Sequence, residues 1–488
     1  AANYSDEIQS YETYTVGQTF VSQRPRLCAI EAAWDPTTDP PGPLVLSLRP
    51  SPDSDQVLAH AEVQPETQQG QAMIHWRFTP LPNSQGQSFY FEISAPQATV
   101  DHPLKLHAMP HNIYKPGQAH ANGLPRAGDL TFYTFYDYNI ALLLQDILKS
   151  LTRLWLIFPF IALFIAPGYL LLQLWPSARR TFDVWSYIGM AFGLSLAISP
   201  WILLWVTQLG GTLLSLATHL LYWGCATAML IHLIFRGVGT FGQDRRSPYV
   251  SVRRPSTNED THTTNESVHT TNKVAHSTNE GTRNPTDMQR DGLLLALILG
   301  AGLVVRLLAI RDLAFPAWVD SVHHALLTRL IYERGQIPTT YAPYIPATPA
   351  TYHYGFQAHV ALFMRLSGLD LPQAMLWVGQ CFNAGMALQV YLLARWLTQR
   401  RWTALFAAFC VAILGTMPAF YVTWGRYTQL AGLLILPIAL ILSVETVMAN
   451  DANTFKDAKG SKTLQHAILT TLTLAGLTLT HYRIFAFY

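Results

Sequence analysis

The sequence predicts a polytopic α-helical membrane bundle of about eight spans, preceded by an extracytoplasmic all-β domain of jelly-roll sandwich type. Of the 488 residues, 50% are hydrophobic and only 13% are charged, whereas about a quarter are charged in an ordinary soluble domain. This composition indicates the membrane bundle. The sandwich is indicated by short N-terminal runs in which apolar and polar residues alternate between clusters of turn residues.

The all-β domain is expected over residues 1–137. In the run SFYFEIS, Phe89, Phe91 and Ile93 alternate with more polar neighbours, and AMIHWRF has the same pattern. Clusters such as PTTDPPGP and PLPNSQGQ mark turns between the strands. Trp34 and Tyr90 have two interpretations: they stack on sugar rings at the surface, or they belong to the sandwich core, which is the commoner place for such residues.

Apolar stretches of about twenty residues predict the membrane helices. Residues 138–235 are expected to hold an interfacial lead-in helix and three spans, and residues 291–488 to hold the remaining spans. The sequence begins without a methionine and ends at Tyr488 within an apolar stretch, so we expect a fragment whose last module is truncated. The expected spans are 153–175, 184–208, 212–235, 292–311, 372–397, 402–424, 429–449 and 464–488.

Basic residues predict the orientation of the spans. Arg179 and Arg180 follow the first span, Arg400 and Arg401 follow the fifth, and the loops after the third and seventh spans are also basic. Such loops are expected to be cytoplasmic. The all-β domain, the segment 312–371, the turn FYVTWGRYTQ and the tripeptide HYR then lie together on the extracytoplasmic side of the membrane.

Residues 236–290 are expected to form a disordered cytoplasmic linker between the third and fourth spans. Asn258, Asn265, Asn272 and Asn279 recur every seven residues within it. No apolar seam accompanies this heptad, so the repeat does not indicate a coiled coil.

An ionisable cluster follows the fourth span in the stretch PAWVDSVHHALLTRL. Asp320 lies three and four residues before His323 and His324, so the three side chains share one face of a helix. This spacing predicts an acid–base or metal-binding cluster. The alternative is an interfacial helix start, with Asp320 as its N-cap and the histidines among the lipid headgroups.

The Pro- and Tyr-rich loop that follows leads into a short interfacial or re-entrant helix from about residue 353. Tyr352 and His353 are its candidate binding residues, and His353 lies near Gly355, where the backbone can approach a ligand closely. For the tyrosines of this loop, an aromatic belt at headgroup depth is the alternative interpretation.

Arginines on the predicted outer face run against the positive-inside bias. A planar guanidinium suits phosphate oxygens, so the arginines of WGRYTQ and HYR are interpreted as anion ligands that are flanked by aromatic side chains. The alternative is that these arginines extend to the lipid headgroups. The candidate binding residues of these two segments are Trp424, Arg426, Tyr427, His481 and Arg483.

The other charged residues of the spans do not indicate a further functional site. Arg306 and Arg311, near the outer end of the fourth span, are expected to extend towards the headgroups. Few other charged residues lie in the expected spans, which disfavours a proton-coupled carrier. No basic stripe with interleaved aromatic residues occurs, so nucleic acid is not an expected partner.

The segments WVDSVHH, YHYGFQ and WGRYTQL resemble segments in uncharacterised bacterial members of the GT-C superfamily, the multispanning membrane glycosyltransferases. The resemblance covers about residues 290–488 and is one of topology more than of sequence. It implies transfer of a sugar, with inversion, from a polyprenyl-phosphate donor to an acceptor hydroxyl of a glycan, lipid or protein. In that scheme Asp320 is the general base, and Arg426 and Arg483 neutralise the departing lipid phosphate.

The resemblance also implies roles for the histidines. His323, His324 and His353 either hold a divalent cation or donate hydrogen bonds to the phosphate. Mg²⁺ or Mn²⁺ is the implied cofactor, with Asp320 and His324 as candidate ligands.

The chain departs from the family pattern in its acidic residues. The family commonly has an acidic pair in the first loop, whereas the acids nearest to Asp320 are Asp312 and Glu333. Either the pair is split in sequence, or one carboxylate works with the histidines, or activity has been lost. The competing interpretation is a carbohydrate-binding membrane receptor, or an exporter component for cell-surface polysaccharide, in which the sandwich is the working part.

Overall fold

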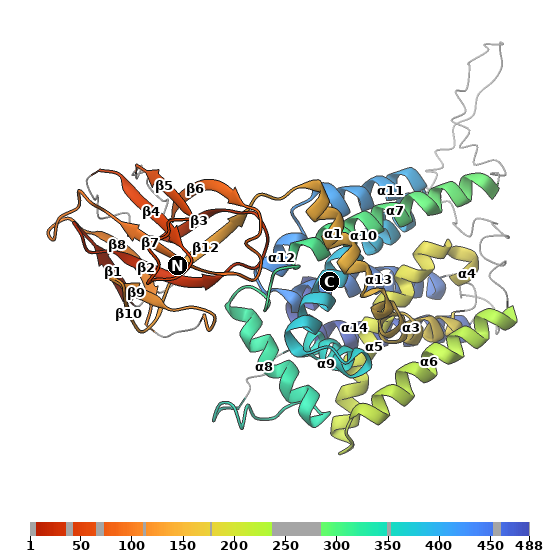
Figure 1. The fold of residues 1–488 in the computed structure, drawn as a ribbon. Coiled ribbons are helices and arrows are strands. Elements are labelled where there is room, and N and C mark those ends of the chain that lie inside the picture. The colour runs from red at the N-terminus through yellow and green to blue at the C-terminus, as the bar shows by residue number, and fades with distance from the viewer. Residues whose placement is uncertain are drawn as a thin grey trace, which may run out of the picture. The chain divides into compact units, whose positions relative to one another are not determined.

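The structure is a computed structural model that divides into two units, Ala1–Asp146 and Ile147–Tyr488. Figure 1 shows that the first unit is built of strands and the second of helices. Most of the predicted linker 236–290, with its heptad repeat, lies outside the described residues. The described residues are 6–35, 42–64, 73–110, 114–175, 178–236, 285–348, 353–451 and 460–487.

The described strands of the first unit form three antiparallel sheets. Their strand orders are β1-β8-β11, β10-β9-β2-β7-β4-β5 and β12-β3-β6. Apart from the pairs β9-β10 and β4-β5, neighbouring strands are not consecutive in sequence, so the sheets depend on pairings between distant parts of the chain. The bounds are β1 Asp6–Ser10, β2 Val16–Val21, β3 Leu27–Ala33, β4 Leu44–Arg49, β5 Ala59–Val63, β6 Met73–Leu81, β7 Ser88–Ser94, β8 Leu104–Met109, β9 Ala119–Ala121, β10 Leu124–Pro125, β11 Asp129–Leu130 and β12 Phe132–Tyr136.

The predicted alternation of buried and exposed residues is confirmed in β6, whereas in β7 Tyr90 is buried along with the predicted core residues. Phe89, Phe91 and Ile93 of β7 are buried in one apolar core, because successive side chains of a strand point to opposite faces. Trp34 and Tyr90 are only 2% and 1% exposed, so their interpretation as sugar-stacking surface residues is wrong. The β-sheet region is therefore established, whereas the jelly-roll topology stays a prediction.

The second unit is helical, and α1 begins in the first unit and ends in the second. Its first apolar stretch is broken into short helical pieces, α2 and α3 among them, whereas the later helices are longer. The bounds are α1 Ile140–Leu151, η1 Leu154–Leu156, α2 Ile157–Phe164, α3 Ala166–Leu171, η2 Leu172–Leu174, α4 Ala178–Thr181, α5 Val184–Gln208, α6 Ser215–Arg236, α7 Pro285–Ala309, α8 Val319–Arg334, α9 Gly355–Ser367, α10 Leu371–Thr398, α11 Arg401–Phe409, η4 Cys410–Leu414, α12 Ala419–Thr423, α13 Tyr427–Asp451 and α14 Gly460–Phe487.

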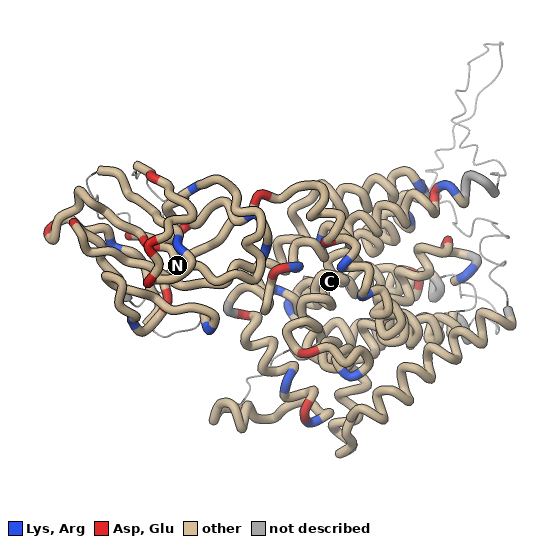
Figure 2. The backbone as a smooth tube through the Cα atoms, in the orientation of Figure 1, with Lys and Arg blue, Asp and Glu red and all other residues tan. Residues whose placement is uncertain are grey.

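Within the described residues, six helical segments are long and apolar enough to span a membrane. The membrane bundle predicted from composition is thereby supported. The expected spans 372–397 and 464–488 correspond to α10 and α14, which are not among these six, so the count of eight stays a prediction. Figure 2 shows that charged residues are sparse along the helices of this unit. The six segments are Leu154–Leu174, Val184–Gln208, Ser215–Phe235, Gln289–Ala309, Arg401–Thr423 and Tyr427–Met448.

Helix α9 occupies the interior of the second unit. Every residue from Gly355 to Ser367 except Arg365 is buried, and the helix contacts α5, α8, α10, α13 and α14. A side chain at position 355 would clash with Thr480 of α14, because a Cβ there would lie 2.4 Å from the Thr480 hydroxyl oxygen. The predicted short helix after residue 353 therefore exists, and it is a core element.

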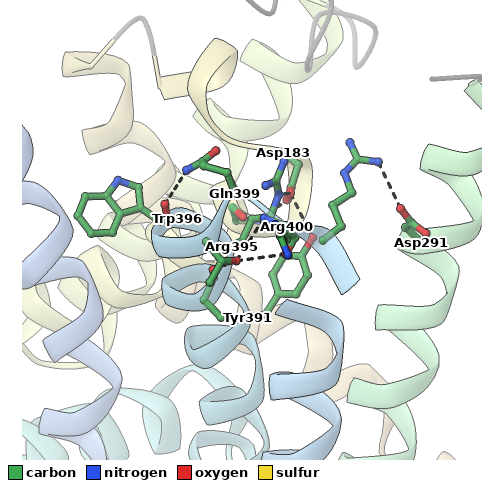
Figure 3. Close-up of polar contacts among 11 residues, drawn as sticks. Asp183, Asp291, Tyr391, Arg395, Trp396, Gln399 and Arg400 are labelled. Carbon is green, nitrogen blue, oxygen red and sulfur yellow. Dashed lines mark hydrogen bonds and ion pairs between the residues drawn. The ribbon is translucent and has the colours of Figure 1, made fainter. Parts of the chain in front are cut away.

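Ion pairs and polar contacts join several helix ends in the second unit. Figure 3 shows Asp183, at the start of α5, beside Tyr391 and Arg395 of α10. The Asp183 carboxylate caps α5 by accepting a bond from the Ser186 amide, lies 3.5 Å from Arg395 Nε and accepts the Tyr391 hydroxyl at 3.1 Å. These contacts fix the register of α5 against α10.

Arg306 of α7 does not extend towards headgroups, so that prediction is wrong. It is 6% exposed, and its guanidinium donates to the side-chain oxygen of Asn383 at 2.8 Å. It also donates to the carbonyl oxygens of Gly302, Ala412 and Val411 at 3.0, 2.7 and 3.1 Å. Val411 and Ala412 lie in the π-helical segment η4, whose irregular backbone leaves carbonyl groups that need other donors.

Candidate functional site

The N-terminus of α8 carries Asp320 in an unusual backbone setting. Trp318 is the N-cap, with φ 75° and ψ 155° and no capping side-chain hydrogen bond. Side chains other than hydrogen are strongly disfavoured in this region, at a cost of about 1–3 kcal/mol. Asp320 lies in the first turn, where the helix dipole favours a negative charge, and its side chain is exposed. Asp320 is therefore not the N-cap of this helix.

The WGRY turn lies directly against this helix end. Gly425 has φ +63°, and a Cβ there would lie 3.3 Å from the Asp320 Cβ and 2.9 Å from the Ser321 hydroxyl oxygen. The indole rings of Trp318 and Trp424 stack with centroids 5.9 Å apart, and the Arg426 guanidinium lies 5.4 Å from the Trp424 ring. Residues about a hundred positions apart in sequence thus place a carboxylate and an exposed arginine on neighbouring elements.

His324 connects three elements through both of its ring nitrogens. Its Nδ1 accepts from the Gln357 side-chain amide of α9 at 2.9 Å, and its Nε2–H donates to the Gly425 carbonyl at 2.9 Å. The ring is 2% exposed, and burial lowers the pKa of His324 to about 4. His324 is therefore a neutral side chain that positions the WGRY turn.

His323 has a different environment from its neighbour. Its Nε2 lies 2.8 Å from the Tyr341 hydroxyl in the loop after α8. Burial lowers the pKa of His323, and the nearby Asp320 carboxylate opposes that shift. Asp320 and the two histidines all lie in α8, as the spacing requires. Each imidazole bonds to a different element, however, and neither bonds to Asp320 in the contacts described above.

A second group of predicted residues surrounds His353. Its Nε2 lies 3.0 Å from the Thr428 hydroxyl, and its ring centroid lies 4.5 Å from that of His481. Burial, and then the nearby side chains of His481, His324 and Arg483, lower the pKa of His353 to about 3. His353 is therefore neutral at ordinary pH.

α14 is interrupted where it meets this group. His481 has an extended backbone, and its Nδ1 accepts from the Ile484 amide at 3.2 Å, as an N-cap does. The break exposes the two following residues, and the Arg483 guanidinium lies 5.9 Å from the Tyr482 ring. His353 bonds to Thr428, two residues after Arg426, and its ring lies beside that of His481, two residues before Arg483, so His353 connects the two segments that carry the exposed arginines.

We use the name Asp320 cluster for the residues that these contacts bring together. With the histidines neutral, its lasting charges are the carboxylate of Asp320 and the guanidinium groups of Arg426 and Arg483. Such a set is able to take a proton and to hold an anion. Its members are Asp320, His323, His324, His353, Trp424, Arg426, His481 and Arg483.

Tyr427, a predicted site residue, is not part of this cluster. Tyr427 is 1% exposed and stacks on Phe356 at 4.9 Å between ring centroids, so its side chain belongs to the helix core. Tyr352 lies outside the described residues.

The described residues do not fit a metal centre built on Asp320 and His324. Both ring nitrogens of His324 are engaged, and no group of three or more His, Cys, Asp or Glu side chains in the described part of the chain is arranged to hold a metal ion. We therefore derive no chemical step through a cation.

Sequence reasoning did not identify Trp318 or Gln357. Gln357 is fully buried among apolar residues of α9, and a glutamine in an apolar stretch signals a buried hydrogen bond without naming its partner. The conformation of Trp318 has no signal in sequence at all.

Replacing Gly425 with alanine is expected to weaken the fold at this turn. The positive φ costs an alanine about 1–2 kcal/mol, and the new methyl group would also press on Asp320 and Ser321. Gly368→Ala is the matched control, because Gly368 has φ +68° and open space around it. Thermal unfolding should show a larger loss for Gly425→Ala than for Gly368→Ala; equal losses would mean that the turn does not pack on α8.

The comparisons with known proteins concern the helical unit. No curated protein matches the chain. The model of a family of unknown function, DUF6541, matches residues 161–487, which is more than half of the chain. The matched range begins after the strands of the first unit and contains every member of the Asp320 cluster. The chain therefore belongs to the family of unknown function DUF6541.

Proposed function

We propose that this protein is an inverting membrane glycosyltransferase that moves a sugar from a polyprenyl-phosphate donor to an acceptor hydroxyl. The acceptor is a glycan, lipid or protein, and the reaction takes place on the extracytoplasmic face of a bacterial plasma membrane. The observation that carries the proposal is the close approach of the Gly425 backbone to Asp320, because it brings the start of α8 against the turn that carries Arg426. The resemblance to GT-C enzymes supports the same reaction.

In this reaction the acceptor oxygen attacks the anomeric carbon as Asp320 takes the hydroxyl proton. The bond between the anomeric carbon and the phosphate oxygen breaks, and its electron pair leaves with the lipid phosphate. Arg426 and Arg483 neutralise that phosphate through charge-assisted hydrogen bonds. His324 and Gln357 hold the WGRY turn in place and transfer no proton, since both nitrogens of the imidazole are already bonded.

The competing function, a carbohydrate-binding receptor or exporter component, has less support. Its named sugar-stacking residues, Trp34 and Tyr90, are buried in the first unit. It predicts sugar binding without turnover, so one assay separates the two functions.

The test measures lipid-phosphate binding and sugar transfer together, using membranes that carry the full-length protein. The probes are a long-chain polyprenyl phosphate and its glucosyl and mannosyl esters. Losing one charged hydrogen bond costs about 1.5–3 kcal/mol, so Arg426→Gln and Arg483→Gln should each weaken binding of the bare lipid phosphate at least about tenfold.

Arg329→Gln is the matched control, because Arg329 is an exposed arginine of α8 that pairs only with nearby groups at Glu333 and Tyr344. It should bind the lipid phosphate as the native protein does. Native affinity in the Arg426→Gln/Arg483→Gln double variant would contradict the anion-binding role, and sugar binding without transfer in the native protein would favour the receptor.

A further inference from the structure

Trp318 and Trp424 form an aromatic pair at the exposed side of the Asp320 cluster. Their rings are nearly parallel, with an interplanar angle of 14°, and they are 57% and 39% exposed. Phe420 packs on Trp424 at 4.3 Å between centroids, so the more open of the two indoles is Trp318. The pair therefore leaves the Trp318 indole, backed by Trp424, as its more open aromatic face, two residues before Asp320.

The backbone of Trp318 indicates that this surface is more than incidental. An aromatic residue at a membrane interface needs only a suitable depth, whereas Trp318 occupies a conformation that suits glycine. Residues held in such conformations cluster at functional sites. Trp318 lies two residues before Asp320, and its indole stacks on that of Trp424.

We infer that the Trp318–Trp424 pair is the platform for the transferred sugar ring, an inference that rests on the proposed function. The C–H face of a pyranose stacks on flat aromatic rings, and its hydroxyls and anomeric phosphate need polar partners around that ring. Asp320, two residues after Trp318, and Arg426, two residues after Trp424, supply those partners. An isoprenoid chain on the same surface would bring apolar groups against a carboxylate, which is unfavourable.

The arrangement orders the substrate along the cluster. Arg426 lies over Trp424 and holds the phosphate, while the sugar extends over Trp318 towards Asp320. The anomeric carbon then lies between the leaving phosphate and the acceptor hydroxyl, as inverting displacement requires. The platform contributes to binding of the sugar and not to binding of the bare lipid phosphate.

The decisive variant is Trp318→Gly, because glycine accepts the backbone conformation without strain. Equilibrium binding of labelled polyprenyl phosphate and of its glucosyl and mannosyl esters is measured with the full chain in lipid nanodiscs. The native protein should bind at least one ester about tenfold more tightly than the bare lipid. Trp318→Gly should reduce that ratio to about one, leave bare-lipid affinity unchanged and unfold at the native temperature or above it. Trp318→Tyr should keep most of the preference.

Trp402→Leu is the matched control, since Trp402 is a 59% exposed tryptophan on α11, and it should keep the native ratio. An unchanged ratio in Trp318→Gly would overturn the platform. If Trp318→Gly bound the bare lipid and both sugar esters more weakly by the same factor, the platform would also be overturned, and the pair would be assigned to membrane anchoring. A native protein that binds bare and sugar-bearing lipids equally would overturn the platform alone, whereas failure to bind any of them would overturn the proposed function as well.

Discussion

Replacement of Asp320 with asparagine is expected to reduce sugar transfer by about 10²–10⁴-fold, the usual contribution of a positioned general base. Asparagine keeps the shape of the side chain but cannot take the acceptor proton. Because Asp320 is exposed, the variant should fold normally and bind the lipid phosphate at least as well as the native protein. Turnover in membranes, normalised to the amount of folded protein, is the measurement.

The matched control for this variant is Asp312→Asn. Asp312 is an exposed carboxylate that pairs with Arg311 before α8, and its loss should leave turnover within about twofold of native, as for surface changes away from a site. If both variants turn over like the native protein, Asp320 is not the base. If Asp312→Asn is the variant that loses activity, the general base is Asp312.

Arg306→Met is expected to destabilise the helical unit by about 3 kcal/mol or more, because hydrogen bonds to a charged group contribute about 1.5–3 kcal/mol each. Methionine fills much of the space but leaves the Asn383 side-chain oxygen and the carbonyls of Val411 and Ala412 without this donor. Those carbonyls belong to η4 inside a candidate span, where water is scarce. Unfolding in detergent, followed by circular dichroism, gives the loss.

Two further variants define the cause of that loss. Arg311→Met removes an exposed arginine next to the same helix and should cost no more than about 0.5 kcal/mol. Arg306→Lys keeps the charge but lacks the fork of donors, so its stability should lie between native and Arg306→Met. Native stability in Arg306→Met would show that other groups satisfy η4.

Local patterns predicted the elements of this protein well. The alternation in β7 placed Phe89, Phe91 and Ile93 in the core, because burial follows the two-residue period of a strand directly. Apolar length likewise located the six candidate spans. α10 was expected to be a span but is not among these six. It contains the buried polar residues Gln380, Asn383 and Gln389, which lower its apolar character.

The site was only partly predictable, because its contacts join distant segments. Composition and topology singled out Asp320, Arg426 and Arg483, but spacing could not show that His324 faces Gln357 and Gly425. Arg306 was assigned to the headgroups because its position near a helix end says nothing of which neighbour it faces. A residue's partner across the bundle depends on helix rotation, which a single span does not encode.

The bonds of His324 have a mechanical consequence. Since one imidazole is held by α9 on one nitrogen and by the WGRY turn on the other, α8 cannot rotate about its axis without losing both bonds in a buried setting. The start of α8, the turn and the core helix should therefore move as one rigid body. The loop after α8 meets this body at the bond between His323 and Tyr341, so Tyr341 can shift while both bonds of His324 stay intact.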